Sequence, residues 1–202
     1  CGDASMTYAR ATQLLVTVLA TAFTVYHLYG AFVGVPEPFV FRGTHLMWML
    51  VLAFLVYTGF SGRKDEPPGV VDWLFVAASV ASVGYIFYEY EYFITRFATV
   101  DDLRPADWFF SITLIVCILE GTRRVLGSAL SITALVFMAY CLTFTSVSAQ
   151  MMLDQLYMTT DGILGIPISV SATYVVLFII FGAFVEKTGT GKLFMDFGIA
   201  LA

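Results

Sequence analysis

The chain has 202 residues, of which 59% are hydrophobic and only 12% are charged, and its mean hydropathy is +0.86. Soluble domains carry about 25% charged residues, so this composition excludes an ordinary soluble fold. The net charge of −5 comes without a basic patch, which argues against a nucleic-acid partner.

The class of protein follows from several apolar runs of about 18 residues or more, each long enough to cross a hydrocarbon core of about 30 Å as a helix. These runs do not alternate polar and apolar residues as β-barrel strands do. The sequence therefore predicts an all-α polytopic membrane protein whose immediate environment is the lipid bilayer.

About six transmembrane helices are predicted, with the start of a further amphipathic helix in the apolar residues 192–202. Pro36 and Pro38 are expected to form the first turn, and residues 61–69 a polar, Pro-rich loop. The fourth helix is predicted to be short because Glu120 follows it directly. The predicted helices cover residues 12–33, 44–60, 71–94, 108–119, 126–144 and 168–185.

The basic residues predict a cytoplasmic N-terminus, because cytoplasmic loops carry an excess of Lys and Arg. With this topology, seven of the ten basic residues lie inside. The three outside are Arg42, Arg96 and Arg104. The seven inside are Arg10, Arg63, Lys64, Arg123, Arg124, Lys187 and Lys192.

One motif suggests intramembrane chemistry but lacks the required partner. Gly59–Gly62 reads GFSG, as in intramembrane serine proteases, but a serine nucleophile needs a nearby base. Both histidines, His27 and His45, precede Ser61 and fall near the opposite face in the predicted topology. We therefore interpret the motif as a helix-ending turn, and we expect no enzymatic activity.

His27 and His45 could also be a haem or metal pair, but no third ligand accompanies them, and we expect interfacial hydrogen bonding instead. The three cysteines, Cys1, Cys117 and Cys141, lack metal-ligand spacing. Helix packing is expected for the latter two, and a lipidated terminus is the less favoured alternative for Cys1.

Other charged or glycine-rich motifs give weak signals. Residues 189–192 read GTGK, but the glycine that a phosphate loop requires is replaced by Glu186, so this interpretation is rejected. Glu89, Glu91 and Glu120 lie at predicted helix ends, where water and lipid headgroups can solvate them. We therefore assign no ion-coupling role to these acids.

A polar, Gly- and Pro-broken segment precedes the last predicted helix. It contains Thr159, Thr160, Asp161, Gly162, Gly165 and Pro167. Irregular backbone at membrane depth occurs where it lines a cavity or is buried in protein. An external loop followed by a Pro-started helix explains the same residues, and both interpretations stay open at this point.

This segment carries a family resemblance. The run LYMTTDGILGIPISVSATYV at residues 156–175, followed by FGAFVEKTG at 181–189, resembles the fused membrane subunit of TRAP transporters, most closely the TAXI-type branch. In that family a four-helix small module is joined to a larger transport module. A change in composition near residues 123–127 resembles the junction between these two modules.

The resemblance implies that the chain consists of three parts. Residues 1–125 resemble the four-helix scaffold module, residues 126–155 a connecting transmembrane helix with its outer loop, and residues 156–202 the truncated beginning of the transport module. It also implies that the substrate and sodium sites lie beyond Ala202, so no ligand for either is assigned here. The matching residues, whose expected role is architectural, are Asp161, Gly162, Gly165, Pro167, Glu186 and Gly189.

The function implied is that of a membrane component in a sodium-coupled secondary importer of organic anions in the bacterial cytoplasmic membrane. Its implied partners are the remainder of the transport module and a periplasmic TAXI-type binding protein. The alternative is a membrane scaffold or assembly subunit without a transport role. The broken segment at residues 156–167 favours the first hypothesis, because a plain scaffold does not need it.

Overall fold

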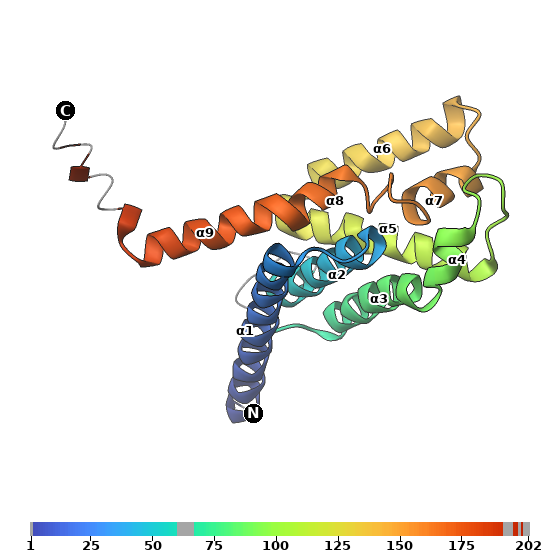
Figure 1. Cartoon of the computed structure of the whole chain (residues 1–202). Helices are drawn as coiled ribbons and strands as arrows, with labels where there is room; N and C mark the ends of the chain where they lie inside the picture. Colours follow the sequence, from blue (N-terminus) through green and yellow to red (C-terminus); the bar gives the residue numbers. More distant parts are fainter. Residues whose placement is uncertain (1, 60–66, 192–195, 198, 200–202) are drawn as a thin grey trace.

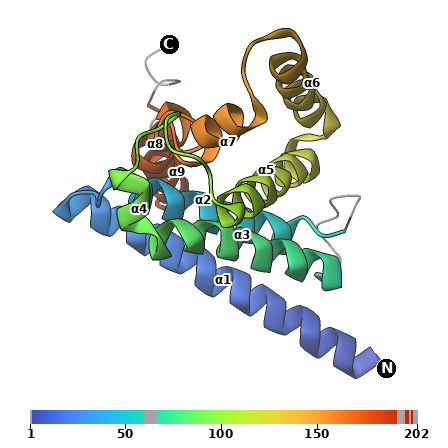
Figure 2. The same cartoon turned by 90° about the vertical axis from the view of Figure 1, so that its right-hand side faces the viewer.

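A computed structural model describes residues 2–59, 67–191, 196, 197 and 199, with side chains from residue 8 onward. These residues form helices and connecting turns (Figures 1 and 2). Cys1, Ser61 and Lys192, to which several predictions refer, lie outside them. The helices are α1 (Gly2–Val33), α2 (Pro38–Val56), α3 (Val70–Tyr88), α4 (Tyr90–Thr95), α5 (Pro105–Leu126), α6 (Ser128–Phe144), α7 (Ala149–Tyr157), α8 (Ile166–Val170), the π-helical η1 (Ser171–Val175) and α9 (Val176–Lys187).

The core lies between α2, α3 and α5, which pack side by side. Phe54 of α2 stacks on Phe75 of α3, with ring centroids 5.0 Å apart. Glycine allows the closest approaches between these helices. A Cβ at Gly43 would lie 3.2 Å from the ring of Phe87, and one at Gly121 would lie 3.3 Å from Leu50. Small residues at such crossings are typical of helix packing in membranes.

The last described helix returns to the first two. Helices α8, η1 and α9 follow one another without a break, and they contact α1 and α2 (Figure 1). Beyond this contact, α9 runs away from the bundle. Helix α6 packs against α5 on the side of the bundle away from α1 (Figure 2). Residues distant in sequence therefore meet where α8 and η1 lie against α1 and α2.

Four helices are long and apolar enough to cross a membrane, and α6 is a shorter apolar helix. The four correspond to the first, second, third and sixth predicted spans. Helix α5, whose last turns contain Glu120, Arg123 and Arg124, is not among them. The described chain is thus all-helical with several candidate spans, while the count of six and the orientation stay predictions. The candidates are Tyr8–Val33, Pro38–Val56, Val70–Tyr88 and Ile166–Lys187.

Several helix ends differ from the prediction. Pro38 starts α2 rather than lying in a turn, because proline fits the first helical turn and the Glu37 carboxylate accepts a hydrogen bond from the Phe39 amide at 2.9 Å. The predicted helix 71–94 is divided at Glu89 into α3 and α4. Helix α5 continues to Leu126 because Glu120 accepts hydrogen bonds from the two arginines that follow it.

Candidate functional site

The candidate site, which we call the joint, is the contact that the broken segment 158–165, α8 and η1 make with α1 and α2. The segment begins after α7, which ends at Tyr157, and it leads into α8 through Gly165 and Pro167. Pro167 occupies the first turn of α8, where its missing N–H leaves no helical hydrogen bond unmade. The Tyr157 hydroxyl donates to the Ser82 carbonyl at 2.5 Å and fixes the end of α7 to α3.

Two glycines allow this segment to fold tightly on itself. A Cβ at Gly162 would lie 2.1 Å from the Gln155 carbonyl oxygen, and one at Gly165 would lie 2.8 Å from the Gly162 carbonyl oxygen. Both obstacles are backbone atoms, which cannot move aside as a flexible side chain can. These positions therefore require glycine for close approach.

Arg42 of α2 binds the backbone of the same segment. Its guanidinium donates to the Leu164 carbonyl at 2.8 Å and to the Thr160 carbonyl at 3.3 Å. Carbonyl groups in a turn have no helical partner, and an unpaired carbonyl is costly when it is buried. Arg42 thus both satisfies these groups and positions the turn on α2.

The helix that follows contains one π-helical turn. In η1 the Val176 amide donates to the Ser171 carbonyl, five residues earlier. Single π turns inside α-helices are rare and occur frequently at functional sites. This turn presents Ser171 to α2, and the next residue, Ala172, is buried with 1% of its surface exposed.

A buried chain of hydrogen bonds, which we call the histidine chain, joins this turn to α1 and α2. Ser171 Oγ lies 3.1 Å from His45 Nε2, and His45 Nδ1 lies 3.0 Å from His27 Nε2. His27 Nδ1 lies 2.8 Å from the Phe23 carbonyl oxygen. The histidines are hydrogen-bonded, as expected, but they bind each other within the protein, and their position at the membrane interface stays a prediction.

The residues of the predicted signature do not gather at one point. Gly162, Gly165 and Pro167 lie in the joint, whereas the Asp161 side chain is exposed. Glu186 is exposed in the last turn of α9, and Gly189, with φ of +74°, follows that helix. The architectural role of these positions stays a prediction, although the close contacts of the first two glycines support it.

Three aspartates that the sequence did not indicate as site residues are buried: Asp72, Asp107 and Asp154. Asp107 accepts hydrogen bonds from the Tyr85 hydroxyl at 2.7 Å and the Tyr92 hydroxyl at 2.9 Å. Burial, and then the hydrogen bond to Asp107, raises the pKa of Tyr92, which lies in the short helix α4. Asp107 also accepts from the Arg104 amide at the start of α5. A capping position is the one signal that could have indicated it.

The other two aspartates pair with arginines. Asp72 accepts from Arg124 at 2.5 Å, and the Arg124 guanidinium lies beside the stacked rings of Phe54 and Phe75, 5.1 Å and 5.3 Å from their centroids. Asp154 of α7 pairs with Arg96. Burial lowers the pKa of Arg96, but the hydrogen bond to Asp154 and its negative charge outweigh burial, so the pKa is raised.

The predicted solvation of the glutamates is only partly right. Glu120 instead accepts hydrogen bonds from Arg123 and Arg124, both at 2.7 Å. Glu89, which directly precedes α4, pairs with the exposed Arg104 at 3.2 Å, and Glu91 is exposed. Among the residues that the structure describes, no group of three or more His, Cys, Asp or Glu could hold a metal ion.

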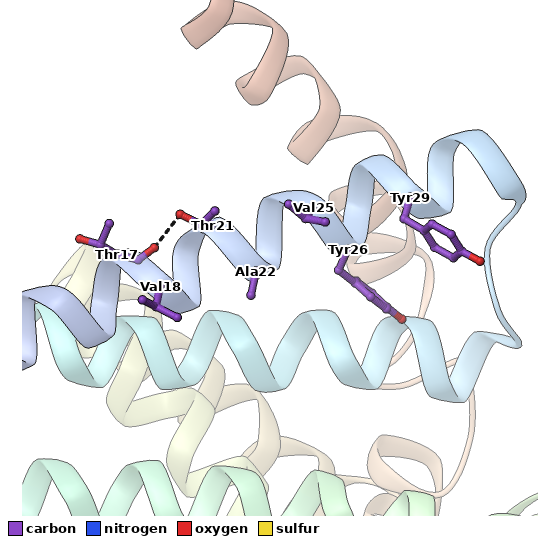
Figure 3. A pocket seen from close by; sticks show the side chains of 7 residues that line it. All are labelled: Thr17, Val18, Thr21, Ala22, Val25, Tyr26 and Tyr29. Atoms are coloured by element: carbon purple, nitrogen blue, oxygen red, sulfur yellow. Dashed lines mark hydrogen bonds between the residues drawn. The ribbon is translucent and has the colours of Figure 1, made fainter.

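A shallow hollow of about 610 Å³ lies along α1 (Figure 3). Its lining residues all come from α1, and the hydroxyl of Thr21 donates to the Thr17 carbonyl at 2.8 Å. None of these residues is charged, so the hollow suits an apolar neighbour such as a lipid chain and offers no cationic group to an anion. Its lining residues are Thr17, Val18, Thr21, Ala22, Val25, Tyr26 and Tyr29.

The described fold is that of an all-helical protein with several candidate membrane spans. Residues 112–202 match the family model of the tripartite ATP-independent periplasmic transporter, DctM component. The match begins within α5 and includes the whole of α6, α7, α8 and α9, so it contains the broken segment and Ser171. It supports a membrane component of such a transporter. No curated protein and no solved structure matches the chain.

Proposed function

We propose that this chain is a membrane component of a TRAP importer, in which the first helices form a scaffold and residues 156–202 begin the transport module. The main support is that the broken segment and the π turn, which form one side of the joint, lie inside the residues that match the transporter family. There Arg42 and His45 of α2 contact the turn before α8 and the π turn after it. A helix that only anchored the chain would need neither the glycine turn nor the π turn.

The finer parts of the proposal come from the resemblance of residues 156–189. They are coupling to sodium, an organic-anion substrate, a periplasmic TAXI-type binding protein and a place in the bacterial cytoplasmic membrane. The scaffold role of residues 1–125 agrees with the buried ion pair of Asp72 and Arg124, which connects α3 to α5. Residues 126–155 then connect the two modules through α6 and α7.

The test is uptake by liposomes that contain the complete transport system, including this chain and its binding protein. We expect substrate to accumulate only with an inward sodium gradient and with the binding protein present. Collapsing the gradient with an ionophore, or omitting the binding protein, should each abolish accumulation. Uptake that ignores both conditions would contradict the proposal.

The alternative of a non-transporting assembly subunit predicts a different outcome in the same assay. Gly162→Ala distorts the joint, whereas Gly182→Ala changes a helical position in α9 with no atom within 4 Å of the added Cβ. Among complexes that assemble equally well, we expect only Gly162→Ala to slow transport. Equal uptake by the two variants would favour the assembly role.

A further inference from the structure

The histidine chain has one consistent assignment of protons when both rings are neutral. The Phe23 carbonyl can only accept, so His27 Nδ1, 2.8 Å away, carries a hydrogen. A neutral imidazole has a single N–H, so His27 Nε2 accepts from His45 Nδ1. His45 Nε2 then accepts from the Ser171 hydroxyl. Both rings are thus Nδ1–H tautomers, and the chain runs from Ser171 toward α1.

The same chain can hold one additional proton without losing a hydrogen bond. If His27 becomes an imidazolium, its Nε2 donates to His45 Nδ1, and the His45 hydrogen moves to Nε2. Ser171 Oγ, which can both donate and accept, then accepts from His45. A second proton cannot be accommodated, because two N–H groups would face each other between the rings.

The surroundings favour His27 as the charged ring. The rings of Phe23, Tyr26 and Phe41 lie around it, with centroids 4.2, 5.3 and 5.6 Å away. Aromatic rings within about 6 Å attract a cation, and the Phe23 carbonyl accepts from its other nitrogen. His45 has no comparable carbonyl partner among the described residues, since its two nitrogens contact His27 and Ser171.

The charged groups on the surrounding helices either bind other residues or lie far from the two histidines. On α2, Arg42 binds the turn before α8, and Glu37 caps the helix about 12 Å along its axis from His45. On α1, Arg10 lies about 25 Å along the axis from His27. On the last helix, Glu186 and Lys187 lie more than about 20 Å from Ser171, and Tyr174 is the nearest titratable group. No described carboxylate contacts either imidazole.

We propose that His27 and His45 form a buried site for a single proton, and that its occupancy is transmitted to the π turn by reversal of the hydrogen bonds at His45 and Ser171. The reversal changes Ser171 from donor to acceptor and frees its hydroxyl hydrogen for a carbonyl of its own helix. The site thus couples a proton on α1 to the helix that follows the broken segment. It is a property of the fold and does not depend on the proposed transport function.

The test uses nitrogen NMR of protein labelled with 15N only in histidine. His27 and His45 are the only two histidines in the sequence, so four ring signals are expected when the purification tag lacks histidine. At about pH 8, above the ordinary imidazole pKa of about 6.5, each ring should carry its hydrogen on Nδ1. On acidification one ring should become doubly protonated and the other should change tautomer.

Ser171 variants separate this role from simple packing. Ser171→Ala removes the donor to His45 Nε2 from the neutral pair and the acceptor for His45 Nε2–H from the protonated pair, so the proton affinity should shift by less than about tenfold, while protonation should no longer change the backbone NMR signals of the π turn. Ser171→Thr keeps the hydroxyl and should keep the affinity. Nε2–H tautomers at high pH, two independent titrations, or no proton uptake while the protein stays folded would each overturn the proposal.

Discussion

Asp154 of α7 and Arg96, which follows α4, form an ion pair in which the two side chains are 2% and 3% exposed. Asp154 also accepts from the Thr99 amide, and Arg96 donates to the Asp101 carbonyl at 2.7 Å. The pair therefore connects the loop before α5 to the helix that precedes the joint. A buried pair of this kind contributes most clearly when one partner is removed, since the other charge is then left without compensation.

We expect Asp154→Asn to destabilise the protein by about 3–5 kcal/mol, because it leaves the Arg96 charge buried. Thermal unfolding in detergent measures the change. Gln150→Ala is the matched control, since Gln150 lies on the same helix and makes an exposed hydrogen bond to Asp102. Equal unfolding temperatures for the Asp154 variant and wild type would contradict the importance of this pair.

Gly162→Ala should strongly destabilise the turn before α8, because the added methyl would meet the Gln155 carbonyl oxygen at 2.1 Å. Gly182→Ala should be neutral or stabilising by up to about 1 kcal/mol, since alanine is the better helix former. Proteolysis of the folded protein reports on the turn directly. Faster cleavage between α7 and α8 is expected in the first variant and not in the second.

Asp107→Asn should cost about 1–3 kcal/mol, because the amide replaces one acceptor oxygen with a donor that faces a tyrosine hydroxyl. The two hydroxyls come from Tyr85 and Tyr92. In a double-mutant cycle, Tyr92→Phe should reduce the penalty of Asp107→Asn. Strictly additive effects on unfolding would show that this contact makes no contribution.

The predicted orientation is tested by labelling single cysteines in intact cells. Asp101→Cys lies in the loop after α4, and Val70→Cys lies at the opposite end of α3 and is exposed. With a cytoplasmic N-terminus, a membrane-impermeant maleimide should label residue 101 from outside and should reach residue 70 only after cells are opened. The reverse pattern would contradict the assignment made from Lys and Arg.

Much of the helical layout could be predicted because local signals determine it. Long apolar runs indicated α1, α2 and the α8–α9 helix, and Gly127, with φ of +90°, separates α5 from α6 near the predicted change in composition. The extension of α5 was missed because Glu120 and the arginines after it resemble a loop when their mutual pairing is unknown. Charged residues therefore indicate the end of a helix only when no residue within the same helix pairs with them.

The candidate site was less predictable because its contacts join distant residues. His45 and Ser171 are separated by 126 positions, and Arg42 and Leu164 by 122. The glycines and Pro167 indicated an irregular segment, but no pattern in the sequence shows which helix lies against it. The π turn was not predicted either, since residues 171–175 (SATYV) lie inside the predicted helix 168–185 and contain no glycine, proline or charge that would mark it.

Helix α6 corresponds to the fifth predicted span, and if it crosses the bilayer its length bears on the thickness of the membrane around it. It has 17 residues and therefore spans about 26 Å, less than a hydrocarbon core of about 30 Å. Its outer side, with Leu130, Phe137 and Phe144, is exposed in the described chain. A short apolar helix is accommodated by local thinning of the bilayer. Shorter-chain lipids should therefore gather beside α6, and reconstitution in them should favour the folded protein.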